Sequence, residues 1–179
     1  MYKLRELEQK DVPEISLWRR DHRVVDFFES PFRYCNQEVE NQWYQNYMRN
    51  RANTIRLAVA EDETDDIIGL VSLTGIDYIS RKGEFHIMIG HEENKGKGIG
   101  TYATREMLKH SFLNLNLNRV ELSVLDQNIR AKHVYEKCGF QYEGKKREAA
   151  YKNGEYVDIC MYSILKKEFP DVFQNTYGG

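Results

Sequence analysis

The hydrophobic pattern of the chain changes at about residue 55 from mainly helical to mainly alternating. Before that point, a short alternating run over 2–7 predicts a first strand. A capping box at 11–14 predicts the start of one helix, and apolar residues at helical spacing predict another over 37–51. The buried face expected for this second helix carries Val39, Trp43, Tyr47 and Met48.

Beyond residue 55, strands and helices follow one another. The pattern predicts strands over 55–60, 67–76, 84–89, 119–125 and 156–165, a further strand that starts at 140–143, and helices over 98–112 and 127–138. The acidic turn at 61–66 and the Asn153–Gly154 pair predict antiparallel neighbours, whereas the strand–helix–strand passages predict parallel ones. We therefore expect an α/β fold, with helices on the faces of a mixed sheet.

Composition narrows the class of protein. The 179 residues are 41% hydrophobic and 30% charged, which suits one globular domain over 1–169 with a C-terminal tail over 170–179. A net charge of −2 argues against a nucleic-acid partner. The charged N-terminus does not resemble a signal peptide, and no apolar run approaches the ~20 residues of a membrane span. The three cysteines form no CxxC pair, so we expect no metal, no membrane and a cytoplasmic location.

The run KGKGIGT, from Lys95 to Thr101, is a candidate anion site. It follows a predicted strand and opens a predicted helix, whose N-terminus exposes unpaired N–H groups and the positive end of the dipole. Its three glycines allow a ligand to approach the backbone. Two common phosphate loops do not fit, because no Ser or Thr follows the Gly–Lys pair and Thr101 replaces the third glycine of the dinucleotide fingerprint. The alternative interpretation, that the run is an ordinary glycine-rich surface turn, stays open.

A second stretch, NIRAKHVYEKCGF from Asn128 to Phe140, changes this picture. Alone, Tyr135 is typical of a core tyrosine with a satisfied hydroxyl. Together, the two stretches resemble the acetyl-CoA motifs of the GNAT acetyltransferase superfamily, a [QR]xxGxG/A loop and an NxxAxxxYxxxGF helix. The element order is similar up to about Phe169, and the resemblance is to the branch with ribosomal-protein N-terminal, spermidine and amino-sugar-nucleotide N-acetyltransferases. Lys95 departs from the Gln or Arg of the motif.

The resemblance implies a GNAT-like, mostly antiparallel mixed sheet in which two parallel strands splay apart. It implies acetyl-CoA as co-substrate, with its pyrophosphate on the backbone N–H groups of the glycine loop and its pantetheine arm in the gap between the strands. The cofactor-binding residues implied are Met88, Ile89, Gly90, Lys95, Gly96, Lys97, Gly98, Ile99, Gly100, Thr101, Asn128 and Ala131.

The resemblance also implies direct acetyl transfer to an amine, with Tyr135 protonating the leaving thiolate and a strand N–H near Met88 or Ile89 binding the carbonyl oxygen. An amine is mostly protonated at neutral pH, so a base or a water relay must remove a proton. Glu84 is the candidate base, since alternation puts it on one strand face with His86 and Met88. The other face, with Phe85, Ile87 and Ile89, is expected to be core. The alternative interpretation, that Glu84 is only an exposed carboxylate at the edge of the strand, stays open.

The acceptor amine is not fixed by the motifs. A polyamine would need a carboxylate-lined pocket, for which the candidates are Glu29, Glu38, Glu40 and Glu84. A nucleotide-linked amino sugar would suit the basic residues Arg19, Arg20, His22 and Arg23. We expect a small-molecule primary amine, with both classes open. Acetylation of protein N-termini, a non-catalytic acetyl-CoA sensor and a homodimeric assembly are further alternatives.

Overall fold

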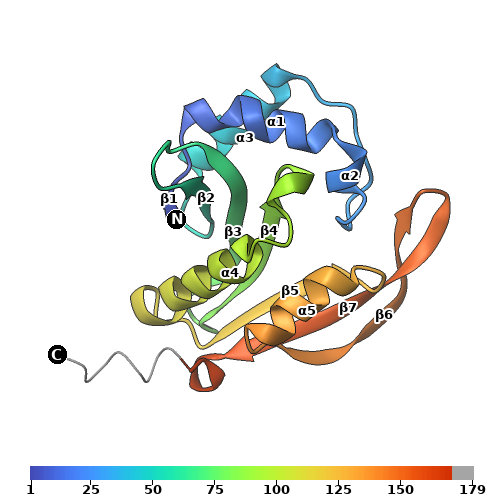
Figure 1. Cartoon of the computed structure of the whole chain (residues 1–179). Coiled ribbons are helices and arrows are strands. Elements are labelled where there is room, and N and C mark those ends of the chain that lie inside the picture. The colour runs from blue at the N-terminus through green and yellow to red at the C-terminus, as the bar shows by residue number, and fades with distance from the viewer. Residues whose placement is uncertain (171–179) are drawn as a thin grey trace.

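The computed structural model describes residues 1–170 and consists of one seven-stranded sheet with helices on both faces (Figure 1). The strands are β1 (Tyr2–Glu6), β2 (Ile55–Glu61), β3 (Ile67–Asp77), β4 (Lys82–Ile89), β5 (Arg119–Leu125), β6 (Gln141–Lys152) and β7 (Glu155–Leu165). The α-helices are α1 (Val12–Arg20), α2 (His22–Val25), α3 (Gln37–Arg49), α4 (Ile99–Lys109) and α5 (Ile129–Lys137). Short helical turns lie at Gln9–Asp11, Glu92–Asn94, His110–Asn114 and Lys166–Glu168.

The strand order is β1-β2-β3-β4-β5-β7-β6, and neighbouring strands are antiparallel except for β4 and β5. These two parallel strands are paired only from Lys82–Arg119 to Glu84–Glu121. Beyond Glu84 they diverge, and Figure 1 shows β4 turning away from β5 toward α1 and α2. The predicted fold class, a mostly antiparallel mixed sheet with a splayed parallel pair, is confirmed.

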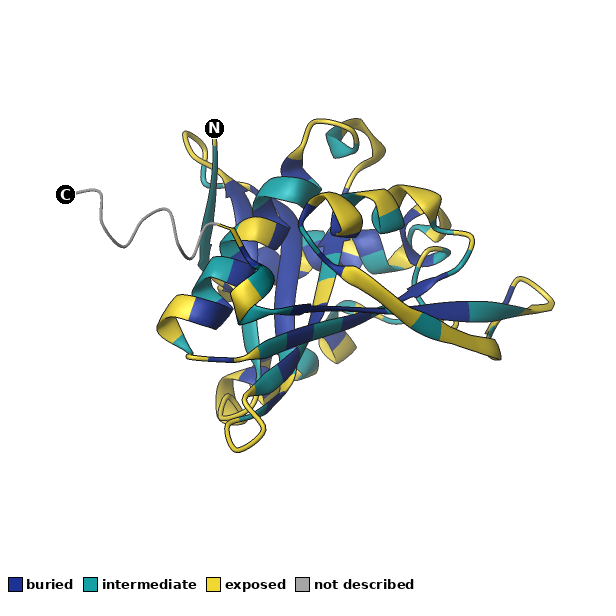
Figure 2. Ribbon diagram, turned by 90° about the horizontal axis from the view of Figure 1, so that it is seen from below, coloured by how far each residue is buried: buried dark blue, intermediate teal, exposed yellow. Residues whose placement is uncertain are grey.

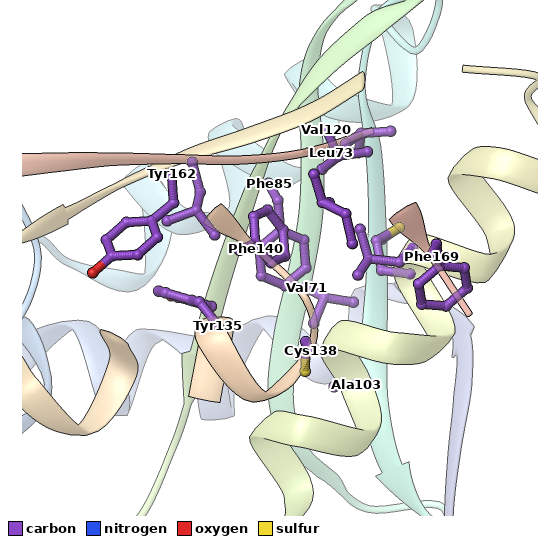
Figure 3. Packing of buried hydrophobic residues seen from close by; sticks show 14 of the residues in the cluster. Val71, Leu73, Phe85, Ala103, Val120, Tyr135, Cys138, Phe140, Tyr162 and Phe169 are labelled. Atoms are coloured by element: carbon purple, nitrogen blue, oxygen red, sulfur yellow. The ribbon is translucent and has the colours of Figure 1, made fainter. Parts of the chain in front are cut away.

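The sheet has a core on each face. On one face, α4 and α5 pack against the strands through a cluster that includes Met107, Tyr135, Phe85 and Phe140. Figure 3 shows Phe85 and Phe140 at the centre of this cluster, with Tyr135 beside them. On the other face, α1 and α3 form a second cluster with the strands. Figure 2 shows the buried residues gathered on the central strands, whereas β6 is mainly exposed.

The buried face of α3 differs from the prediction. Val39 and Met48 are 52% and 41% exposed, whereas Tyr44 and Tyr47 are buried. The buried face also includes Glu40, a charged residue that is 2% exposed and ion-paired with Arg19 of α1 at 2.6 Å. A buried ion pair can therefore belong to a helix face that hydrophobic spacing alone assigns otherwise.

The strand face predicted to be core is confirmed at Phe85, which is 2% exposed. Met88, on the opposite face, is also buried, because α1 and α3 cover that side of the sheet. β6, predicted to start at 140–143, continues to Lys152 and so reaches the predicted Asn153–Gly154 turn, through two register shifts against β7. The predicted C-terminal tail, apart from Pro170, lies outside the described residues. Within residues 1–170, no helix combines the length and apolarity that a membrane crossing requires.

Candidate active site

A cavity of about 890 Å³ lies where β4 and β5 separate. It contains both predicted catalytic residues, Tyr135 and Glu84. The predicted cofactor-binding residues in its wall are Met88, Ile89, Lys95, Gly96, Gly98, Gly100, Thr101, Asn128 and Ala131. Three predicted residues lie outside the wall: Gly90, Lys97 and Ile99. Residues distant in the sequence therefore meet in one cavity of a size typical for a small-molecule site.

The glycine loop leaves the N-terminus of α4 open. Gly96 and Gly98 have φ angles of 83° and 82°, a left-handed conformation that favours glycine. Gly98 is the N-cap of α4, and no side chain caps the helix there. A Cβ atom on Gly98 would have no heavy atom within 4 Å, so the space above it is open. The N–H groups of the first helical turn, which begins at Ile99, are left for an anion such as a pyrophosphate.

A further positive charge beside this loop comes from Arg130, a residue that the sequence did not single out. Lys95 is already engaged, with its Nζ atom 2.5 Å from Glu92 Oε2 and 3.4 Å from the carbonyl oxygen of Arg23. Arg130, in the first turn of α5, lies against the loop, because a Cβ atom on Gly96 would be 3.2 Å from its Nη2 atom. Its Nη1 atom is 3.8 Å from Oε1 of the same Glu92, so Lys95 and Arg130 share one carboxylate. The sequence did offer one indication of this role, because Arg130 lies only two residues after Asn128 of the helix motif.

Asn128 and Ala131 have a structural relationship in addition to lining the cavity. Asn128 Oδ1 accepts a hydrogen bond from the backbone N–H of Ala131 at 3.1 Å. Asn128 is therefore the N-cap of α5. An asparagine at this position stabilises the helix start and fixes the direction in which α5 leaves the loop.

Tyr135 lies on α5 and is 7% exposed. Its ring meets Phe85 edge-on, with centroids 6.3 Å apart, and also contacts the ring of Phe140 at 5.9 Å. Burial raises the pKa of the Tyr135 hydroxyl far above its ordinary value of 10.0. Among residues 1–170 the hydroxyl has no hydrogen-bond partner. It is thus a protonated group beside the cavity with a proton to donate.

Glu84 and His86 lie on the same face of β4, and both line the cavity. Their Oε2 and Nε2 atoms are 3.9 Å apart, and His86 Nε2 is 2.9 Å from Thr74 Oγ1. Loss of hydration in the cavity lowers the pKa of His86 below 6.5, although the Glu84 charge opposes this shift. At neutral pH the imidazole is therefore uncharged, and Glu84 gives the pair a net negative charge.

The register of β4 decides which backbone groups face the gap. Gly90 N–H donates to Ile68 O at 3.0 Å, so the backbone groups of Gly90 are directed toward β3. Antiparallel pairing alternates, which directs the Met88 backbone toward β3 and the Ile87 and Ile89 backbones toward the gap. Ile87 was missing from the predicted set, and Met88 borders the cavity through its side chain.

Gly90 has a packing role that explains its place outside the cavity wall. A Cβ atom on this residue would lie 2.2 Å from Cε2 of Trp18. The indole is held there because its Nε1 atom donates to Glu14 Oε1 at 2.9 Å. The same oxygen is 2.6 Å from Nε2 of His91, immediately after Gly90. The contact joins α1 to the end of β4.

The charged residues predicted to select an acceptor are only partly brought together. Of the four basic candidates, Arg19 lines the cavity, whereas Arg20, His22 and Arg23 do not. Of the four carboxylates, Glu29 and Glu84 line it, and Glu38 and Glu40 do not. Arg56 of β2, which was not predicted, is also in the wall. Its position depends on strand register, which the local sequence does not reveal.

Lys152, at the end of β6, binds the segment that follows α2 and contributes to the cavity wall. Its Nζ atom donates to the carbonyl oxygens of Val25 at 3.1 Å and Ser30 at 2.9 Å. The residue is 5% exposed, and burial lowers the pKa of its amine. The β6–β7 hairpin is thereby tied to the segment after α2 that carries Glu29.

Comparison with known proteins agrees with this geometry. The model of the acetyltransferase (GNAT) domain family matches residues 2–141. A spermidine N(1)-acetyltransferase of Vibrio cholerae is 35% identical over 93% of this chain and 94% of its own. The putative ribosomal N-acetyltransferase YdaF of Bacillus subtilis is 39% identical over 58% of this chain and 56% of its own.

A solved structure agrees over nearly the whole fold. The spermidine N-acetyltransferase from Vibrio cholerae, in complex with CoA and spermine, matches with a TM-score of 0.86 and 30% identity. The match covers 93% of this chain and 96% of that chain. The family match, the curated relative and the shared fold lead to one conclusion: the chain belongs to the GNAT acetyltransferase family and is an acetyl-CoA-dependent N-acetyltransferase.

Proposed function

We propose that the chain transfers the acetyl group of acetyl-CoA directly to a primary amine of a small molecule, with Tyr135 as general acid and Glu84 as general base. The observation that carries the proposal is that three features needed for the reaction border one cavity. The open N-terminus of α4, the protonated Tyr135 and the Glu84 carboxylate all border it. A carrier site, an acid and a base thus share one enclosed space.

Acetyl-CoA would be held by two sets of backbone groups, one at the start of α4 and one on β4. The N–H groups at the start of α4 would bind the pyrophosphate, and Arg130 beside Gly96 would add positive charge. The backbones of Ile87 and Ile89 would bind the pantetheine arm as an added strand. Asn128 would act through its cap on α5, because the direction of that helix sets the position of Tyr135.

The proposed reaction conserves protons and charge in a simple way. Glu84 takes one proton from the acceptor ammonium, directly or through water, which frees the nitrogen lone pair. The nitrogen then forms a bond to the acetyl carbon, the carbon–sulfur bond breaks, and Tyr135 donates its proton to the departing thiolate. The second proton of the nitrogen passes to the Tyr135 phenolate, directly or through water, which leaves a neutral amide and a protonated Tyr135. A backbone N–H of Ile87 or Ile89 would bind the carbonyl oxygen as its charge develops.

The acceptor remains the finer question within this function. The Vibrio cholerae relative is named for spermidine, whereas the Bacillus subtilis relative is named as a putative ribosomal acetyltransferase. A volume of about 890 Å³ suits a small molecule together with part of the carrier. A polyamine and an amino sugar are both primary amines of that kind, so the charges at the acceptor end of the cavity must distinguish them.

The test is an acceptor screen that follows free thiol release with wild type and Tyr135→Phe. The variant keeps the buried ring and removes the proton donor. We expect kcat to fall by about 100-fold or more while the Kd for acetyl-CoA stays the same. Tyr162→Phe is the matched control, because Tyr162 is equally buried but its hydroxyl donates to Glu136 at 3.0 Å, away from the cavity wall.

Two results would contradict the proposal. An unchanged kcat in Tyr135→Phe would leave Tyr135 with a packing role only. A wild-type protein that binds acetyl-CoA but releases no thiol with any amine would instead be the non-catalytic sensor.

A further inference from the structure

Arg56 carries a charge that the described part of the protein does not neutralise. Its Nη1 atom donates to Ser72 Oγ at 3.1 Å, and its Nε atom is buried without a hydrogen-bond partner. Among residues 1–170, no carboxylate forms an ion pair with this guanidinium. Nη2 also has no protein partner there and, unlike Nε, is not sealed from solvent. An uncompensated, partly buried charge is costly and is a common mark of a binding site.

Arg56 belongs to a row of polar residues that leads to the proposed base. The register pairs Arg56 of β2 with Ser72 of β3, and Ser72 with His86 of β4. Paired residues in a sheet project from the same face, and neighbouring strands lie about 4.8 Å apart. The backbone of Arg56 is therefore roughly 10 Å from that of His86 on one sheet face. Both residues line the cavity.

A second guanidinium lies beside Arg56. The Cζ atom of Arg19 is 4.1 Å from the ring centroid of Trp43, and that of Arg56 is 5.1 Å from the same centroid. Glu40 neutralises Arg19 through an ion pair of 2.6 Å. Burial and the neighbouring charge of Arg19 lower the pKa of Arg56, as expected for a cation without a counter-charge.

Near Tyr135 the charged side chains are negative instead. Glu84 is 3.9 Å from His86, and the charge of Glu29 acts on both His86 and Tyr135. All of these side chains are in the cavity wall. The acceptor end thus has an anionic side where the amine would react and a cationic side, on the same strand row, where Arg56 lies.

We propose that Arg56, assisted by Arg19, is an anion subsite, and that the acceptor is therefore a primary amine that also carries a carboxylate or phosphate group. This inference rests on the proposed function and names the class of its acceptor. Guanidinium groups bind carboxylate and phosphate oxygens strongly. An acceptor with one amine and one anion would satisfy both sides of the cavity. A fully extended polyamine would instead bring further positive charge toward Arg56.

The experiment compares amines that differ in one anionic group. The pairs are O-phosphoethanolamine with ethanolamine, glucosamine 6-phosphate with glucosamine, and L-alanine with L-alaninamide, together with spermidine. We expect at least one anion-bearing amine to exceed its neutral partner and spermidine in kcat/KM by about 10- to 100-fold. In Arg56→Gln this preference should disappear, mainly through a higher KM. Arg56→Lys should retain part of it.

Arg20→Gln is the matched control. Arg20 neighbours Arg19 on α1, but its Nε atom donates to Ser16 O at 3.1 Å and it is not part of the cavity wall. This variant should keep the wild-type acceptor preference. Each variant is also tested for thermal stabilisation by acetyl-CoA, which shows that the fold and the carrier site are intact.

The outcomes separate this inference from the proposed function. If spermidine or the neutral amines are the better substrates and Arg56→Gln behaves as wild type, the function stands and the anion subsite is wrong. If no amine reacts, titration of O-phosphoethanolamine and glucosamine 6-phosphate into the CoA-bound protein decides. Binding that Arg56→Gln loses supports the subsite, and the absence of binding overturns it. Failure of acetyl-CoA to stabilise the protein would count against the function itself.

Discussion

The indole of Trp18 lies directly against Gly90, so that a Cβ atom at position 90 would be 2.2 Å from Cε2 of the ring. No real side chain tolerates such an approach, and a buried tryptophan held by Glu14 has little freedom to move. Helix α1 and the end of β4 are therefore packed through a glycine, and this contact positions α1 relative to the strand that carries Glu84.

Gly90→Ala should destabilise the fold by about 1–3 kcal/mol, because the added methyl group must displace either the indole or the strand. Denaturant unfolding measures the loss. The matched control is Gly100→Ala in the first turn of α4, where a Cβ atom would meet only Val134 Cγ1 at 3.9 Å. Equal stability losses in both variants would contradict the special role of the Trp18 contact.

Gly98→Ala should weaken acetyl-CoA binding. The position has a φ angle of 82°, and a non-glycine residue in this left-handed region costs roughly 1–2 kcal/mol, which favours a different loop conformation. The measurement is the stabilisation by acetyl-CoA, which for wild type at 100 times Kd is about 2.7 kcal/mol. We expect a smaller stabilisation at the same concentration in the variant.

Gly154→Ala provides the control for the loop glycine. Gly154 also has a positive φ angle, 92°, and open space where a Cβ atom would lie, but it belongs to the β6–β7 turn. It should lose a similar amount of folding stability and keep wild-type affinity for acetyl-CoA. A parallel loss of affinity in both variants would mean that general destabilisation, rather than loop geometry, weakens binding.

Glu84→Gln should lower kcat/KM by about 100-fold, with the largest deficit at the lowest pH, where the acceptor amine is hardest to deprotonate. A pH series from 6 to 9 checks this. Burial raises the pKa of Tyr135, so its proton stays in place across that range and adds no alkaline decline to either profile. A deficit that is the same at every pH would remove Glu84 from the role of base.

Glu121→Gln is the control for the carboxylate. Glu121 is the register partner of Glu84 on β5, but it accepts a hydrogen bond from Arg119 at 2.9 Å and does not line the cavity. Its replacement should leave the pH profile unchanged. A deficit like that of Glu84→Gln would indicate a general electrostatic effect on the sheet.

Lys152→Met should raise the KM for the acceptor by about 10-fold and leave the Kd for acetyl-CoA unchanged. The two carbonyl oxygens that Lys152 binds would lose their donor, at a cost of about 1–3 kcal/mol, and the segment that carries Glu29 would lose its tie to β6. Lys146→Met, on the exposed part of the same strand, is the control. Wild-type kinetics in Lys152→Met would show that this tie is not needed for acceptor binding.

The parts of the site that could be predicted from the sequence are those whose chemistry is local. Gly98 and Asn128 each occupy the N-cap position of the helix that follows them, so their neighbours in the sequence are also their neighbours in space. Helix and strand order was predictable for the same reason, since it depends on periodicity and turn residues. The splayed strand pair came from the resemblance of two motifs and not from periodicity.

The parts that could not be predicted depend on contacts between distant elements. Arg56 reaches the cavity through the register of three strands, and Lys152 reaches it from the end of a long hairpin. The predicted buried face of α3 was right at Tyr47 and wrong at Val39 and Met48, and the partner of the buried Glu40 lies on another helix, at Arg19. In each case a charged residue is placed by a partner that its own segment does not contain.

The separation of β4 and β5 has one further consequence. Beyond Glu84 the sheet contains two unpaired strand edges in its middle, and such edges are templates to which any extended chain can add. Most proteins protect edges at the rim of a sheet with charge, bulges or short strands. Here the interior edges border a cavity whose wall includes residues of α5 and of the start of α4, so helices flank the edges that a neighbouring chain would have to reach.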